Sequence, residues 1–272
     1  MSTSKLKTAI ACGASLLIGA ATFCGTEKRA TATPATLGYY PATDICDTGT
    51  FHLDISSYGS SLNANSSVTG GLTYGLGKDT DGLFGRSEIG FDYVLSLGGS
   101  SPSALGIGTG DRLLFNAKTQ IFNNDKNGTR VVAGVWGVGD KVLSAPDVGY
   151  ITGSKTFSFG RIHVGLAHSF ANATTVKTPD GYSDRTNLHL GYDRYLTPKI
   201  QFAVDYYSGK SSYSGVQPTV YYYVNPKASF GLGLMHFNDG SITPSRNQIY
   251  TCFDYYFGGE PATTPTAAPN TN

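Results

Sequence analysis

The stretch Gln248–Phe257, which reads QIYTCFDYYF, carries the clearest strand pattern in the chain. Its apolar and aromatic side chains alternate along the backbone: Ile249, Phe253, Tyr255 and Phe257. Cys252 and Asp254 occupy positions between them. Because successive side chains of a strand point to opposite faces, this stretch is predicted to be a strand with one apolar, aromatic-edged face and one polar face.

The same alternation recurs between residues 48 and 257 and predicts about twelve strands. Near the start, Phe51 and Ile55 alternate with His52 and Asp54. The pattern weakens in the middle, where Arg130–Val138 is expected to be a strand with two fairly apolar faces. Residues 148–156 are expected to form a weak strand with uncertain ends, so the exact count over 130–160 stays open.

The connections between the expected strands alternate in length. Tight turns are predicted at 123–128, 196–199 and 224–227, and the last two each contain a proline that cannot extend a strand. Longer polar loops are predicted at 98–110, 171–184, 208–218 and 238–247. Short turns on one side and long loops on the other predict an antiparallel sheet with both ends on the short-turn side, which requires an even strand count.

The two ends of the chain differ in composition from the middle. Lys5 and Lys7 precede an apolar run from Ala9 to Phe23, so residues 1–32 are predicted to be a signal peptide. Residues 33–47, which contain two prolines, are predicted to be an irregular N-terminal segment. Residues 258–272 are rich in Pro, Thr and Ala and are predicted to be a disordered tail.

Composition narrows the class of protein. Charged residues make up 14% of the chain, against about 25% in ordinary soluble domains. The formal net charge of +1 gives no sign of nucleic-acid binding. No later apolar run approaches the roughly 20 residues that a membrane helix needs, so any crossing of a membrane would use strands. Pairs of tyrosines near strand ends suit a bilayer interface, and a soluble secreted β-protein is the alternative.

Two stretches resemble a known group of proteins. The final strand, with Phe253, Tyr255 and Phe257, is similar to the C-terminal signal that the barrel assembly machinery of the bacterial outer membrane reads. The run from Gly191 to Gly209 resembles a strand–periplasmic turn–strand unit of porin-like outer-membrane proteins.

The resemblance covers residues 48–257 and implies an all-β fold: a single transmembrane antiparallel β-barrel with short periplasmic turns and longer extracellular loops. It also implies export to the cell outer membrane, contact with outer-membrane lipid and insertion by the barrel assembly machinery. The oligomeric state stays open.

The polar face of the strands would point into the barrel. The side chains expected to line a pore are Asp54, Glu88, Asp92, Lys118, Arg130, Arg161, His163, His189, Asp193, Asp205 and Asp254. Inward glycines such as Gly75 and Gly231 would leave space. We therefore expect a channel for passive passage of small polar solutes, with mild cation preference because the six acids exceed the three Lys and Arg (6 − 3 = 3). The alternative is a non-conducting structural or surface-binding barrel that acts through its extracellular loops.

Other chemistry is less well supported. No cysteine and histidine spacing suits zinc, and neither a metal nor a cofactor is expected. The run His168-Ser-Phe-Ala-Asn172 departs from the His-x-Ser-Asn-Gly pattern of barrel phospholipases, so the protein is not expected to be an enzyme. Cys46 and Cys252 would both meet an oxidising compartment after export, and they are candidates for a disulfide that helps to close the barrel. Two separate apolar fillers are the alternative.

The predicted barrel has a direct consequence for handling. A closed barrel with an apolar exterior should need detergent to stay dispersed and should give a β-rich circular dichroism spectrum. Size-exclusion chromatography after native extraction checks this. A single monodisperse peak in detergent-free buffer would mean that the membrane interpretation is wrong.

Overall fold

The computed structural model describes residues 36–59, 67–78, 81–96, 112–139, 147–170, 185–211, 213–241 and 246–259. The predicted signal peptide, the loops predicted at 98–110 and 171–184 and most of the predicted tail lie outside these residues. Among the described residues no helix is long and apolar enough to cross a membrane.

The described chain forms thirteen strands. They are β1 Thr50–Gly59, β2 Ser67–Leu76, β3 Gly82–Leu83, β4 Ser87–Ser96, β5 Arg112–Asn124, β6 Thr129–Val138, β7 Val148–Phe157, β8 Gly160–Ser169, β9 Thr186–Thr197, β10 Ile200–Tyr207, β11 Gly215–Asn225, β12 Ala228–Phe237 and β13 Asn247–Gly258. β3 is a two-residue strand that pairs with β5 alone.

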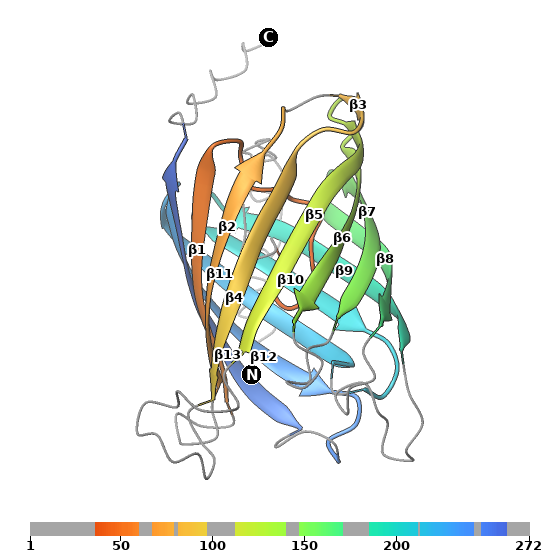
Figure 1. Ribbon diagram of the computed structural model, residues 1–272, viewed down its shortest axis with the longest axis vertical. Helices are drawn as coiled ribbons and strands as arrows, with labels where there is room; N and C mark the ends of the chain where they lie inside the picture. The colour runs from red at the N-terminus through yellow and green to blue at the C-terminus, as the bar shows by residue number, and fades with distance from the viewer. Residues whose placement is uncertain are drawn as a thin grey trace, which may run out of the picture.

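The other twelve strands close into an antiparallel barrel, drawn as a tilted ring in Figure 1. Neighbours in the chain pair with one another, and β5 pairs with β6. The first and last strands complete the ring, with Asp54 opposite Asp254 and Ile55 opposite Phe253. The prediction of an all-β closed barrel with an even strand count is confirmed, and the uncertain region 130–160 contains β6 and β7.

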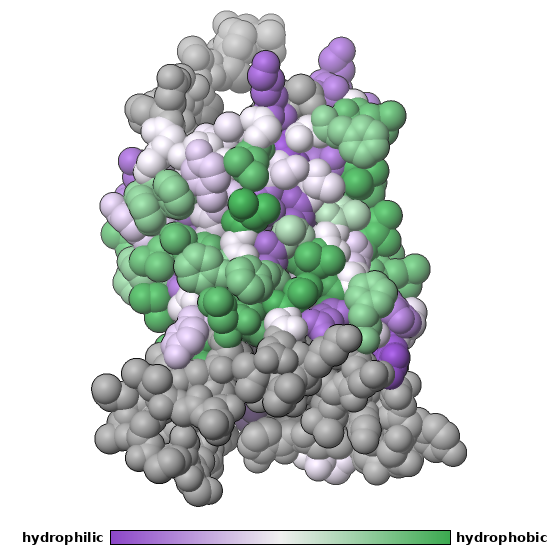
Figure 2. All heavy atoms as spheres, viewed as in Figure 1, coloured by the Kyte–Doolittle hydropathy of each residue, from purple (hydrophilic) through white to green (hydrophobic). Residues whose placement is uncertain are grey.

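The two faces of each strand separate by polarity, as the alternation predicts. Apolar side chains point outward and are well exposed: Ile55 at 46%, Phe230 at 52% and Leu232 at 62%. On the face drawn in Figure 2, hydrophobic residues gather across the middle of the barrel. They form part of the apolar belt, the set of outward-facing apolar residues. Polar side chains point inward, and Asp54 and Asp254 are only 4% and 1% exposed. An apolar outside with a polar inside is the inverse of a soluble barrel and matches a transmembrane one.

One predicted loop boundary is wrong. The loop expected at 208–218 ends before Gly215, where β11 begins. Pro218 lies within β11, opposite Val204 of β10. Proline has no backbone N–H to donate, and the pairing of β11 with β12 is interrupted between Val216 and Thr219. The sequence rule that places proline outside strands therefore failed at this position.

The apolar belt predicts a position-dependent cost for an added charge. Leu232→Arg, in the middle of β12, should destabilise the barrel by about 2–4 kcal/mol in a bilayer because the guanidinium would face lipid. Leu83→Arg in β3, which is also an exposed leucine, is the matched control and should change stability little. Urea unfolding in lipid vesicles measures both. Equal effects of the two substitutions would contradict a lipid-facing position for Leu232.

Candidate functional site

The inside of the barrel is occupied by the chain itself. Residues 36–47, called the inner segment here, precede β1 and lie within the ring of strands, where the orange-red trace runs in Figure 1. Most of its side chains are buried: Thr36, Leu37, Tyr40, Ala42, Thr43, Asp44, Ile45 and Cys46. Residues 36–47 of the irregular segment expected at 33–47 are thus an internal element of the fold, and residues 33–35 lie outside the described residues.

Asp205 of β10 holds the tip of the inner segment. Its Oδ2 atom accepts backbone N–H groups from Gly38 at 3.4 Å, Tyr39 at 2.9 Å and Tyr40 at 2.7 Å. Successive N–H groups that converge on one oxygen form a concave anion site. The turn that aims them is closed by a hydrogen bond from Leu37 N to Tyr40 O. Asp205 therefore binds three successive backbone N–H groups of the inner segment.

An ionic contact holds the middle of the inner segment. Asp44 receives both terminal nitrogens of Arg161, at 2.7 and 2.6 Å, and Nη1 of Arg130 at 3.4 Å. Arg161 also donates from Nε to Asp193 at 2.9 Å. His163 Nε2 lies 2.9 Å from the same Asp193 oxygen. Arg161 thus bridges a carboxylate on the inner segment and a carboxylate on the wall, in the bidentate geometry that guanidinium favours.

A third contact holds the end of the inner segment nearest β1. Glu88 accepts the backbone N–H of Cys46 through Oε2 at 2.7 Å, and its Oε1 lies 3.1 Å from Lys118 Nζ. The same ammonium group donates to the carbonyl oxygen of Ala42 at 3.1 Å. This buried ion pair therefore satisfies one donor and one acceptor of the inner-segment backbone, which would otherwise be costly to bury.

Aromatic rings pack around the tip. Tyr40 stacks on the ring of His189, with centroids 3.6 Å apart. Tyr39 lies among Tyr58, Trp136 and Tyr213, all with ring centroids within 6.3 Å. These rings pack the tip of the inner segment against the wall.

Two inward glycines make room for the inner segment. A Cβ atom at Gly75 would lie 2.1 Å from the carbonyl oxygen of Asp47, and one at Gly191 would lie 2.3 Å from a methyl carbon of Leu37. The sequence correctly indicates free space at Gly75. In the structure, backbone of the inner segment occupies that space. That the lumen is open stays a prediction.

All the side chains predicted to line a pore lie on the lumen side of the barrel, but they fall into separate groups. Asp205, Arg161, Glu88, Lys118 and Arg130 contact the inner segment. His163, His189 and Asp193 lie next to these contacts. Asp92 accepts a hydrogen bond from Asn116 on the neighbouring strand, and Asp54 and Asp254 face each other on β1 and β13. That these residues line a conducting path stays a prediction.

Sequence reasoning missed the contribution of the inner segment, above all that of Asp44. The sequence does carry a weak indication that this segment is buried. The stretch Leu37-Gly-Tyr-Tyr-Pro41 is apolar and aromatic, which is unusual for an exposed leader that connects a signal peptide to a barrel.

The predicted Cys46–Cys252 disulfide is absent from the structure. Both cysteines are buried and free. Cys46 Sγ donates to the carbonyl oxygen of Thr50, whereas Cys252 pairs across the sheet with Ser56. Six residues of strand separate these two levels, or about 20 Å, and a disulfide requires Cα atoms within about 7 Å.

His168 and Ser169, near the long-loop end of β8, lie on opposite faces of the strand. His168 Nδ1 lies 2.8 Å from Thr186 Oγ1, and Ser169 is buried on the opposite face of β8. Adjacent residues of a strand point in opposite directions, so these two side chains do not form a hydrolytic pair.

Comparisons with known proteins give only distant structural likenesses. No family model matches the sequence, and no curated protein matches it. Among solved structures, the KdgM porin has a TM-score of 0.47 at 8% identity, over 76% of this chain and 99% of that one. An outer membrane phospholipase dimer from Salmonella typhi has a TM-score of 0.44 at 12% identity, over 76% of this chain and 89% of that one. Omp33 from Acinetobacter baumannii has a TM-score of 0.41 at 12% identity, over 77% and 98%. Likeness this distant does not distinguish a channel from an enzyme.

The Asp205 contact predicts how firmly the inner segment is held. Asp205→Ala removes the acceptor of three backbone N–H groups, and hydrogen bonds to a charged group contribute about 1.5–3 kcal/mol each. We expect maleimide to label Cys46 at least about tenfold faster, measured in a mature chain that carries Cys252→Ser. Asp92→Ala, which removes a buried carboxylate bound to the wall residue Asn116, is the control and should change the rate little. An unchanged rate in Asp205→Ala would show that this carboxylate does not hold the inner segment.

Proposed function

We propose that the protein is an outer-membrane channel for small polar solutes that is closed at rest by its own inner segment. The observation that carries the proposal is the chemistry of the contacts between segment and wall. Asp205, Arg161 and the Glu88–Lys118 pair hold the inner segment through polar groups, and water and ions could solvate these groups after the segment moves.

The size of the barrel supports this interpretation. Wall side chains alone fill barrels of about eight strands, whereas barrels of 16 to 18 strands leave an open channel. Twelve strands lie between these classes, and here the inner segment of the same chain occupies part of the lumen. A barrel with only a structural role could close with fewer strands and would not need buried charges on its inner wall.

The attachment of the inner segment also supports movement. At its C-terminal end Thr48 forms a bridge with Gly75 of β2, and Gly49 N donates to Gly75 O. Gly49 has a positive φ of 76°, a conformation that glycine adopts without strain. The segment therefore joins β1 through a bend at Gly49 that is anchored to β2, and the proposed movement would turn about this bend.

The alternative is a permanently closed barrel that binds partners through its loops. It is favoured by the charge pairing around the inner segment, because Asp44, Arg161, Asp193, Glu88 and Lys118 all have ionic partners. Electrical recording distinguishes the two functions.

A reversible lock tests the proposal. Thr43 Oγ1 and Ser154 Oγ lie 2.6 Å apart, which brings the two Cβ atoms near the separation that a disulfide bridges. Thr43→Cys with Ser154→Cys, in a chain that also carries Cys46→Ser and Cys252→Ser, should be silent in a planar bilayer when oxidised and should show cation-preferring openings when reduced. The parent with only the two serine substitutions is the control and should not respond to the reductant.

Two results would contradict the proposal. Equal conductance in the oxidised and reduced states would show that the inner segment does not close the channel. If neither state conducts, and a correctly folded variant that lacks residues 36–47 does not conduct either, the non-conducting barrel is favoured.

A further inference from the structure

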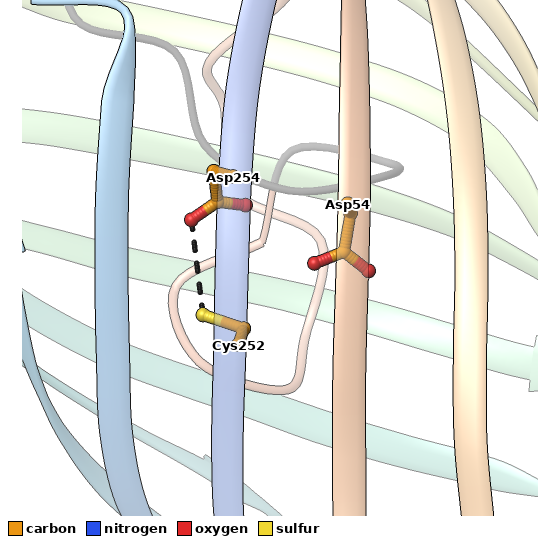
Figure 3. A group of neighbouring side chains, drawn as sticks. All are labelled: Asp54, Cys252 and Asp254. Carbon is orange, nitrogen blue, oxygen red and sulfur yellow. Dashed lines mark hydrogen bonds between the residues drawn. The ribbon is translucent and has the colours of Figure 1, made fainter.

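A second polar cluster lies on the wall of the barrel where its two ends meet. Asp54 of β1 and Asp254 of β13 are directly opposite each other, and Cys252 lies two residues before Asp254 on the same face. Figure 3 shows the three side chains on these two strands. One ligand atom from each residue lies within 4.8 Å of the others, and the residues are 4%, 1% and 5% exposed in the order Asp54, Asp254, Cys252.

The two carboxylates differ in how they are satisfied. Asp254 Oδ1 lies 3.1 Å from His52 Nε2, and its Oδ2 accepts a hydrogen bond from Ser229 Oγ at 2.9 Å. Asp54 Oδ2, in contrast, is buried with no hydrogen-bond partner among the residues that the structure describes. Native proteins seldom leave a buried carboxylate oxygen without a partner, so this atom points to a missing ligand.

The charge balance of the cluster points in the same direction. Carboxylates directly opposite each other on neighbouring strands repel. The ionic contacts of Arg161 and Lys118 are with other acids, namely Asp44, Asp193 and Glu88. Within the described parts of the chain, no ion pair reaches Asp54. A bound cation would relieve the repulsion and would satisfy the free oxygen at the same time.

We propose that Asp54, Cys252 and Asp254 bind one divalent metal ion of the zinc class. Two carboxylate oxygens and one sulfur form a mixed hard and soft ligand set that suits Zn²⁺, whereas Ca²⁺ and Mg²⁺ take oxygen ligands. On binding, the Cys252 S–H bond breaks, a sulfur–metal bond forms and the proton leaves to solvent. His52 would orient Asp254 from behind, as partners of metal-binding carboxylates commonly do.

Sequence spacing could not reveal this group. Asp54 and Cys252 come from opposite ends of the barrel sequence, and only closure of the barrel brings β1 and β13 together. The expectation that the chain contains no metal site rested on local spacing alone. The proposed site does not depend on whether the barrel conducts, because its three ligands all lie on the wall strands β1 and β13.

Cobalt titration tests the site. The full mature barrel is refolded in detergent after chelator treatment, and Co²⁺ alone is added. We expect a thiolate-to-cobalt absorption band in the near ultraviolet that saturates at one equivalent and is displaced by Zn²⁺. Cys252→Ser should abolish the band, and Asp54→Asn should weaken binding at least about tenfold. Cys46→Ser removes the other buried cysteine and is the matched control, so its band should be unchanged.

Each result of the cobalt titration either supports or overturns the metal site. No band in the wild-type protein, or a band that survives Cys252→Ser, would overturn the proposal and leave a shared proton between the two acids as the explanation for the free oxygen. A heat-dependent gel shift reports whether each variant has folded. If Cys252→Ser does not fold, the wild-type and Cys46→Ser proteins decide the matter: each should retain one Zn²⁺ after dialysis, and a metal content near zero would overturn the proposal.

Discussion

The structure depends on one constraint: polar groups inside a closed barrel must find partners within a lumen that wall side chains cannot fill. Twelve strands leave more internal volume than eight, and the inward face of this barrel carries acids, bases, histidines and glycines. The inner segment meets both needs. Its backbone N–H groups satisfy Asp205, its carbonyl oxygens accept from Lys118 and Tyr221, and its carboxylate at Asp44 balances Arg161.

This arrangement separates two kinds of stabilisation. The outer belt of apolar residues is suited to lipid and needs no partner from the protein. The interior is held by hydrogen bonds and ion pairs that gain strength because water is excluded, and that would be costly if only half formed. The inner segment is held by both kinds of contact: solvent could replace its hydrogen bonds and ion pairs, whereas the ring contacts of Tyr39 and Tyr40 would be lost if the segment moved. The cluster at Asp54, Asp254 and Cys252 is the one part of this wall where a carboxylate oxygen lacks such a partner among the described residues.

The sequence predicted the barrel well and its interior poorly, and the reason is physical. Alternation with a period of two is a local property, so the outward position of Ile55 and the inward position of Asp54 could be assigned from neighbouring residues. Pairing across the lumen is not local. Asp205 and Tyr40 are 165 residues apart, and Arg161 and Asp44 are 117 apart. Gly75 indicated free space in the lumen but not which residues occupy it. The predicted Cys46–Cys252 disulfide is absent because the alternation of side chains assigns a residue to a face of the sheet but does not give its height along the barrel axis.

Hydrogen exchange of the inner segment tests the central claim most directly. In the folded barrel in detergent micelles, the amides of Gly38, Tyr39 and Tyr40 should exchange about as slowly as those of the surrounding strands, because they are buried and bound to Asp205. Mass spectrometry of a peptide that covers residues 36–47, compared with one from the middle of β10, gives both rates from one sample. Exchange of the 36–47 peptide as fast as in an unfolded chain, while the β10 peptide stays protected, would show that the lumen is not filled by this segment.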